Sequence, residues 1–205
     1  MSLSIRDALA RLANGQETAI LCSETGFSSA RGEGTELVFP GSFNPLHQGH
    51  CELAQVAGKC LGLTATYELS VRNVDKSALS ADEISTRLQQ FPDSQVLLTN
   101  APLFTDKAAI FPGCAFVVGM DTAERLLNPQ YYGGTAGLTA AMSRFADGGH
   151  RFVVGGRVSV QDGFRTAERL DVPEQFRSLF IVLSESDFRV DLSSTQLREG
   201  GADPV

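Results

Sequence analysis

The chain lacks the features that mark several specialised classes of protein. None of its apolar runs reaches the roughly 18 residues of a transmembrane helix, so no membrane partner is expected. Its four cysteines form no C-x-x-C pair, so no zinc site is predicted, and reduced, buried thiols are expected rather than disulfides. No cluster of Lys and Arg stands out, and the net charge is −7. Because phosphate neutralisation supplies most of the affinity for a nucleic-acid polymer, such a partner is disfavoured.

Two recognisable segments are also missing. The first 14 residues carry Arg6 and Asp7 and no long apolar stretch, which is unlike a signal peptide, so a cytoplasmic location is expected. No G-x-G-x-x-G follows a predicted strand. The backbone of a dinucleotide-binding redox protein needs glycines there, and this chain has His and Pro instead, which disfavours that class.

What is present indicates an α/β domain. The chain has 205 residues, of which 42% are hydrophobic, enough for one sizeable core. Short runs rich in Val, Ile, Leu and Phe alternate with helical patterns, which predicts βαβ units in a doubly wound parallel sheet. The expected strands cover residues 18–22, 36–39, 64–69, 95–98, 114–118, 151–154 and 179–183. The expected helices cover residues 5–13, 49–61, 80–90 and 135–146. Asn14-Gly15 and Gly62 are expected to end the first two, and Ser80-Ala81-Asp82-Glu83 is a capping box that opens the third.

The N-terminal part is the least regular. Residues 23–35 are mostly polar and contain three glycines, which favours a linker. We therefore divide the chain into an N-terminal extension, residues 1–35, packed on or linked to the main domain, and a main domain, residues 36–205. The role of the extension stays open at this stage.

A histidine motif follows the second expected strand. Residues 40–50 read Pro-Gly-Ser-Phe-Asn-Pro-Leu-His-Gln-Gly-His and lead into a helix. The first turn of a helix has unpaired N–H groups and the positive end of the helix dipole, so it attracts anions. His47 and His50 share one face of that turn and can donate hydrogen bonds to phosphate oxygens. Gly49 lets a phosphate approach the backbone. The alternative is a loop with two surface histidines.

These residues resemble the signature of the HxGH nucleotidyltransferases, G-[ST]-F-[DN]-P-x-H-x-G-H, at every fixed position. The resemblance implies a Rossmann-like doubly wound sheet of the HxGH type. It also implies that His47 and His50 hold the triphosphate, with His50 serving the α-phosphate in the transition state. The backbone of Gly41, Ser42 and Phe43 would shape the nucleotide site.

A second motif stands near the C-terminus, where residues 191–198 read Asp-Leu-Ser-Ser-Thr-Gln-Leu-Arg. Ser193 or Ser194 is a good N-cap for a short helix, and Thr195 adds a hydroxyl. Arg198, one turn on, can form two parallel hydrogen bonds to phosphate oxygens. An ordinary capped helix with a solvated Arg is the alternative. The stretch resembles the I-S-S-T-x-[IL]-R element of the family, which implies a β- and γ-phosphate site.

Between the two motifs, the expected strand 114–118 ends in Gly119-Met120-Asp121. A carboxylate just beyond a strand end can accept a hydrogen bond from a ribose hydroxyl. Asp121 is also placed to act as an N-cap for a following helix, and both roles are compatible. Mononucleotide adenylyltransferases of the family have a similar hydrophobic-hydrophobic-G-x-D element facing the nucleotides.

Three residues are candidates for the acceptor side. Asn73 and Lys76 follow the third expected strand in a stretch, Asn-Val-Asp-Lys, that resembles the acceptor loop of nicotinamide mononucleotide adenylyltransferase-like proteins. Arg157 follows the strand 151–154 and offers a cation to a phosphate. A solvated loop is the alternative for each. Many bacterial nicotinate relatives have a Trp downstream of the G-x-D element that stacks in the acceptor region, whereas this chain has no Trp.

The resemblance implies an adenylyltransferase of NAD biosynthesis. It would transfer AMP from ATP to nicotinamide or nicotinate mononucleotide and release pyrophosphate, with Mg²⁺ held mainly by substrate phosphates. Transfer from CTP, a different phosphorylated acceptor, and a nucleotide-binding protein without catalysis all stay open. The sequence also leaves open whether the chain forms a homo-oligomer.

Overall fold

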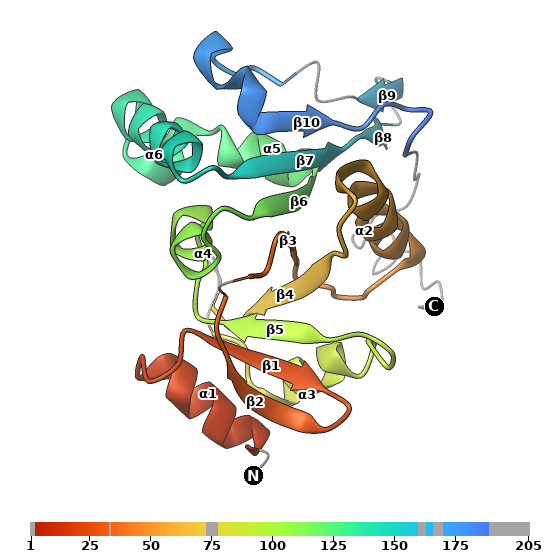
Figure 1. Ribbon diagram of the computed structural model, residues 1–205, viewed down its shortest axis with the longest axis vertical. Helices are drawn as coiled ribbons and strands as arrows, with labels where there is room; N and C mark the ends of the chain where they lie inside the picture. The colour runs from red at the N-terminus through yellow and green to blue at the C-terminus, as the bar shows by residue number, and fades with distance from the viewer. Residues whose placement is uncertain (1–2, 33, 73–77, 160–162, 166–169, 189–205) are drawn as a thin grey trace.

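The computed structural model describes the whole chain except residues 1–2, 33, 73–77, 160–162, 166–169 and 189–205. Its centre is an eight-stranded sheet in the order β10-β7-β6-β3-β4-β5-β1-β2, and a separate two-stranded sheet pairs β8 with β9 (Figure 1). The strands are β1 Ala19–Ser23, β2 Gly26–Ala30, β3 Leu37–Pro40, β4 Thr66–Ser70, β5 Val96–Thr99, β6 Ala115–Gly119, β7 Arg151–Gly155, β8 Arg157–Ser159, β9 Gly163–Arg165 and β10 Phe180–Val182.

Most of the large sheet is parallel. The pairs from β10 through β7, β6, β3 and β4 to β5 all run in the same direction. From β3 the chain moves outward to β4 and β5, then returns across β3 to β6 and continues to β7 and β10. The strand order therefore reverses between β3 and β6. This order is compatible with a Rossmann-like fold, in which ligands bind beyond the carboxyl ends of the strands at that reversal.

Helices cover both faces of the sheet. α1, α2 and α3 pack on one face and α4, α5 and α6 on the other, which gives two hydrophobic clusters. This three-layer arrangement explains why the parallel strands are apolar on both sides. The helices are α1 Ile5–Ala13, α2 Gln48–Leu61, α3 Ala81–Leu88, α4 Phe104–Ile110, α5 Met120–Leu126 and α6 Thr135–Asp147, with 3-10 turns η1 Pro129–Tyr132 and η3 Glu174–Leu179.

The expected strands and helices are confirmed, with ends that differ by one or two residues. The expected capping box is present, since the Ser80 N–H donates to Glu83 and the Glu83 N–H donates to the Ser80 hydroxyl. The short helix α4 was not anticipated. Lys107 lies on its buried face and interrupts the apolar periodicity by which a helix is recognised.

The expected linker at 23–35 was wrong in part, because Gly26–Ala30 forms strand β2. This strand pairs antiparallel with β1, and β1 pairs antiparallel with β5, so the hairpin extends the parallel sheet. None of the five residues of β2 is fully buried. An edge strand without a buried apolar face gives no alternating pattern, which is why the sequence reads as a linker.

Composition predicted buried, reduced thiols and no membrane span. All four cysteines are free, but only Cys114 is buried, and Cys51 and Cys60 are exposed. Within the described ranges, no helix combines the length and the apolar character that crossing a bilayer requires. The expectation of buried thiols therefore holds for Cys114 alone.

Candidate active site

The histidine motif lies at the reversal of strand order. β3 ends at Pro40, and α2 begins at Gln48 with His47 as its N-cap. His50 is the third residue of α2, so both imidazoles belong to the first turn, as the sequence predicts. Gly49 is buried in the same turn. The free N–H groups of a 14-residue helix therefore point into the region beside the two histidines.

The two imidazole rings are stacked. Their centroids lie 3.8 Å apart, with an angle of 28° between the ring planes. The backbone N–H of His47 donates to Nδ1 of His50 at 3.3 Å, and the N–H of His50 donates to the carbonyl of His47 at 2.8 Å. These bonds fix the orientation of the His50 ring.

His47 is only 7% exposed. Its Nδ1 atom is buried and faces the backbone N–H of His50. That N–H donates to the His47 carbonyl at 2.8 Å, so no described residue gives Nδ1 a hydrogen bond of normal geometry. A buried polar atom is normally hydrogen-bonded, so an orphan is a reason to look for a missing partner. A bound phosphate oxygen would be such a partner for this nitrogen.

Burial controls the charge of the histidine pair. Desolvation, with a further contribution from the neighbouring His47, lowers the pKa of His50 to about 3. Desolvation also lowers the pKa of His47. A free imidazole, with a pKa near 6.5, is partly charged at neutral pH. In the folded protein without ligand the pair is instead neutral, and a bound polyphosphate would shift it toward the charged form.

Phe43 gives the loop its unusual shape. Its φ angle is +43°, in the left-handed region that non-glycine residues rarely adopt. Its ring is completely buried and contacts the rings of Phe39, Tyr67, Phe91 and His50, with centroid distances of 5.2 to 5.6 Å. The family resemblance gives a role in the nucleotide site to the backbone of Phe43. In the structure the ring of Phe43 also packs against the ring of His50.

The same ring explains why residue 41 is glycine. A Cβ atom on Gly41 would lie 2.5 Å from the Phe43 ring, which is itself held by its aromatic neighbours. The Gly41 N–H donates to the carbonyl of Glu68 on β4 at 3.0 Å. The loop therefore leaves β3 close to β4, with the Phe43 side chain folded back underneath it.

Two side chains of the α3 region hold the loop backbone. Arg87 donates from Nη1 to the carbonyl of Ser42 at 3.0 Å. Gln90 donates to the carbonyl of Phe43 at 3.0 Å and accepts from the N–H of Leu46 at 2.7 Å. Neither residue was expected at the site from the sequence. They are more than 40 positions away from the loop, and no local pattern indicates the contact.

The G-x-D element lies at the end of the neighbouring strand. β3 pairs with β6 so that Val38 is opposite Phe116, and continuing this register sets Gly41 level with Gly119. Gly119 is the N-cap of α5, and a Cβ atom built on it would meet nothing within 4 Å. Asp121 is exposed in the first turn of α5. The expectation that Asp121 is itself the N-cap was wrong, because α5 has Gly119 as its N-cap and begins two residues earlier than the sequence pattern indicates.

Several expected site residues lie outside the part of the chain that the structure describes. They are Asn73 and Lys76 on the acceptor side and Ser193, Ser194, Thr195 and Arg198 of the second motif. Arg157 begins β8, but its side chain is also outside the description. The structure thus brings together His47, His50 and the Gly41–Phe43 backbone.

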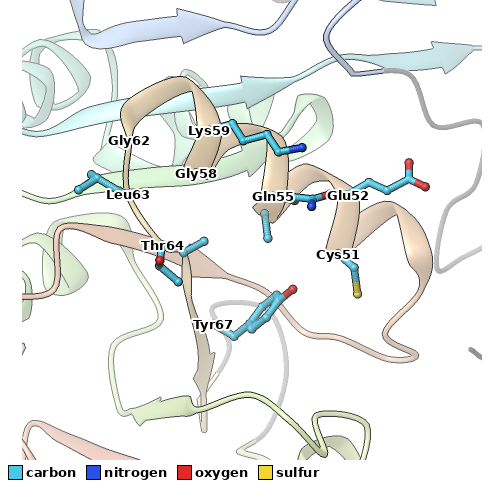
Figure 2. A pocket seen from close by; sticks show the side chains of 11 residues that line it. Cys51, Glu52, Gln55, Gly58, Lys59, Gly62, Leu63, Thr64 and Tyr67 are labelled. Atoms are coloured by element: carbon cyan, nitrogen blue, oxygen red, sulfur yellow. The ribbon is translucent and has the colours of Figure 1, made fainter.

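A groove runs along α2 and β4 on the same face of the sheet, with a volume of about 640 Å³. Figure 2 shows Cys51, Gln55 and Lys59 along α2, with Thr64 and Tyr67 on the opposite side. Tyr67 and Cys51 line the same end of the groove, and burial, followed by the neighbouring Cys51, raises the pKa of the Tyr67 hydroxyl. The Tyr67 ring also contacts Phe43, so one end of the groove adjoins the aromatic support of the histidine loop.

The other buried ionisable groups lie in the core, away from the histidines. Lys107 forms an ion pair with Glu68 at 2.7 Å, and Thr99 donates a hydrogen bond to the same carboxylate. His150 is buried beside Cys114 at the amino ends of β6 and β7, the opposite edge of the sheet. Burial lowers the pKa of His150. These contacts assign a structural role to each group.

Among the described residues, no group of three or more His, Cys, Asp or Glu side chains gathers as a metal site would require. A metal ion used at this site would therefore need oxygen ligands from elsewhere, such as a bound polyphosphate. Comparison of the chain with models of protein families and with curated proteins finds no match.

Proposed function

We propose that this protein is a nucleotidyltransferase of the HxGH class. It transfers AMP from ATP to a phosphorylated acceptor, nicotinamide or nicotinate mononucleotide, and releases pyrophosphate. The observation that carries the proposal is the stacked pair His47 and His50 at the N-terminus of α2. One ring nitrogen of this pair is buried without a hydrogen-bond partner among the described residues, at the edge where α/β sheets bind ligands.

The reaction needs no covalent intermediate. A phosphate oxygen of the acceptor attacks the α-phosphorus of ATP in line and forms the new P–O bond. The bond from the α-phosphorus to the bridging oxygen of the β-phosphate breaks, and its electron pair leaves with pyrophosphate. The acceptor phosphate is already ionised at neutral pH, so the step needs no general base. Catalysis then depends on positioning and on stabilising negative charge.

His47 and His50 supply that stabilisation as hydrogen-bond donors to the phosphates, with His50 at the α-phosphate. Both rings are neutral in the free protein because burial lowers each pKa, and the charge of the triphosphate favours their protonated forms. The backbone of Gly41, Ser42 and Phe43 shapes the site, and the unpaired N–H groups of α2 add positive potential.

The remaining roles in the proposal follow from the family resemblance. Ser193, Ser194, Thr195 and Arg198 bind the β- and γ-phosphates. Asp121 accepts a ribose hydroxyl, while Gly119 leaves room for the nucleotide beside the backbone. Asn73, Lys76 and Arg157 bind the acceptor. Mg²⁺ enters with the nucleotide, held by phosphate oxygens and water, because the described residues offer no cluster of carboxylates.

The decisive test measures pyrophosphate release by the purified protein with Mg²⁺. ATP and CTP are each offered with nicotinamide mononucleotide, nicotinate mononucleotide and other phosphorylated acceptors. We expect turnover with ATP and one of the mononucleotides, and loss of most of it in His50→Ala. Tight binding of ATP without pyrophosphate release from any pair would overturn the enzymatic proposal and leave a nucleotide-binding protein.

A further inference from the structure

The side chain of Gln90 holds the histidine loop at two points. Its Nε2 donates to the carbonyl of Phe43 at 3.0 Å, and its Oε1 accepts from the N–H of Leu46 at 2.7 Å. Gln90 lies just beyond α3, whose C-cap is Gln89. One amide therefore ties both ends of a four-residue segment to another element of the fold, and that segment ends directly before His47.

The backbone of this segment needs such support. Phe43 has a φ of +43°, a conformation that costs a non-glycine residue about 1–3 kcal/mol and persists only where the surroundings enforce it. Its ring is fixed by the buried aromatic cluster, which includes Phe39 and Phe91. Its carbonyl is fixed by Gln90. Side chain and backbone are thus restrained from two directions.

Arg87 extends the same restraint by one residue. Its guanidinium donates to the carbonyl of Ser42 at 3.0 Å, so the end of α3 binds the carbonyls of two successive loop residues. Because Leu46 precedes the N-cap of α2, its bonded N–H sets where the helix starts. The backbone and ring of His47 then orient His50.

We infer that Gln90 is a positioning residue, which holds the backbone of residues 43–46 and thereby sets the location of the His47–His50 pair relative to the triphosphate. Its effect on catalysis rests on the proposed function, whereas its effect on the loop does not. The role requires an amide. Glutamate at this position keeps the acceptor for the Leu46 N–H but sets a carboxylate against the Phe43 carbonyl. Leucine keeps similar bulk and removes both hydrogen bonds.

The experiment compares Gln90→Leu and Gln90→Glu with the control Gln89→Leu, in which the neighbouring exposed glutamine is replaced. Steady-state rates are measured with ATP and the acceptor, and the imidazole titrations of His47 and His50 are followed by NMR. We expect kcat and kcat/KM to fall together by about 10²-fold in Gln90→Leu, as for other misplaced catalytic groups. Gln90→Glu should lose less activity than Gln90→Leu, and Gln89→Leu should have the rates of the wild type.

The NMR titration separates this inference from the proposed function. Loosening the loop exposes the imidazoles, so the pKa of His50 should rise from about 3 toward the ordinary value in Gln90→Leu. In an active enzyme, a Gln90→Leu protein with unchanged kcat overturns the inference. If the wild type shows no turnover, the proposed function fails, and an unchanged His50 titration then overturns the positioning role as well. Should Gln90→Leu not fold, the isosteric Gln90→Glu variant gives both readouts.

Discussion

The Nδ1 atom of His50 accepts the backbone N–H of His47, and the two rings stack at 3.8 Å. Two cationic rings would repel each other at this distance, and burial further disfavours their charge. The free site is therefore a preformed, neutral pair of donors at the start of α2. The approach of a polyanion makes protonation favourable, so binding and proton uptake are expected to be coupled.

Replacing His50 tests its role at the α-phosphate. We expect His50→Ala to lower turnover by about 10²-fold or more, in line with the loss of a donor that stabilises developing charge. Pyrophosphate release under saturating ATP measures the effect. The matched control is His150→Ala, at the opposite edge of the sheet, which should lower the melting temperature and leave turnover unchanged in the folded protein. Near-normal turnover in His50→Ala removes this residue from the chemistry.

The pKa of His50 also predicts how stability depends on pH. In the folded protein the pKa is about 3, whereas an unfolded histidine titrates near 6.5, so the unfolded state binds more protons between these values. Stability should therefore fall as the pH is lowered through this window. His47 and His150 act in the same direction because burial lowers their pKa values too.

The variant His50→Gln isolates the contribution of His50 to this dependence of stability on pH. Urea unfolding of wild type and variant is measured at several pH values between 3 and 7, and the two free energies of unfolding are subtracted. We expect the wild type to lose more stability than the variant on acidification. Parallel curves would mean that His50 is not held neutral by the fold.

Two glycines at the same level of adjacent strands should tolerate replacement by alanine to different extents. In Gly41→Ala the new Cβ meets the fixed ring of Phe43 at 2.5 Å, so we expect a destabilisation of about 1–3 kcal/mol from overpacking. In Gly119→Ala the Cβ enters open space at a helix N-cap, where the change should cost less than about 1 kcal/mol.

Gly119→Ala should instead weaken nucleotide binding, because the added methyl group occupies space that the proposal gives to the nucleotide. Thermal unfolding measures the stability of both variants, and calorimetric titration with ATP measures the affinity of Gly119→Ala. A folded Gly119→Ala protein that binds ATP as tightly as the wild type would show that the nucleotide does not approach this strand end.

The buried pair of Lys107 and Glu68 gives a prediction about stability alone. Lys107→Met leaves a carboxylate that is 0% exposed without its cation, and breaking such a pair typically costs about 3–5 kcal/mol. The double variant with Glu68→Leu removes both charges, and we expect it to recover much of this loss. Chemical denaturation of the wild type, Lys107→Met and the double variant measures their free energies of unfolding and checks this order of stability. Equal stability of Lys107→Met and wild type would contradict a buried charge.

Much of the fold was predictable because its signals are local. Apolar runs marked the parallel strands, the Ser80–Glu83 capping box marked the start of α3, and the Asn14-Gly15 and Gly62 stops marked helix ends. Strand β2 and helix α4 escaped prediction, since one is a polar edge strand and the other has a buried lysine that pairs with a distant carboxylate. Their identity depends on partners that are remote in the sequence.

For the candidate site, the sequence by itself determined that two imidazoles stand at the start of a helix that follows a buried strand, because strand, turn and helix signals lie within about 15 successive residues. Tertiary structure alone decided three further properties. These are the low pKa of His50, the burial of His47 Nδ1 without a hydrogen-bond partner among the described residues, and the hydrogen bonds from Gln90 to the backbone of the histidine loop. Each arises from burial or from contacts between segments far apart in the chain, and no local pattern of residues encodes these.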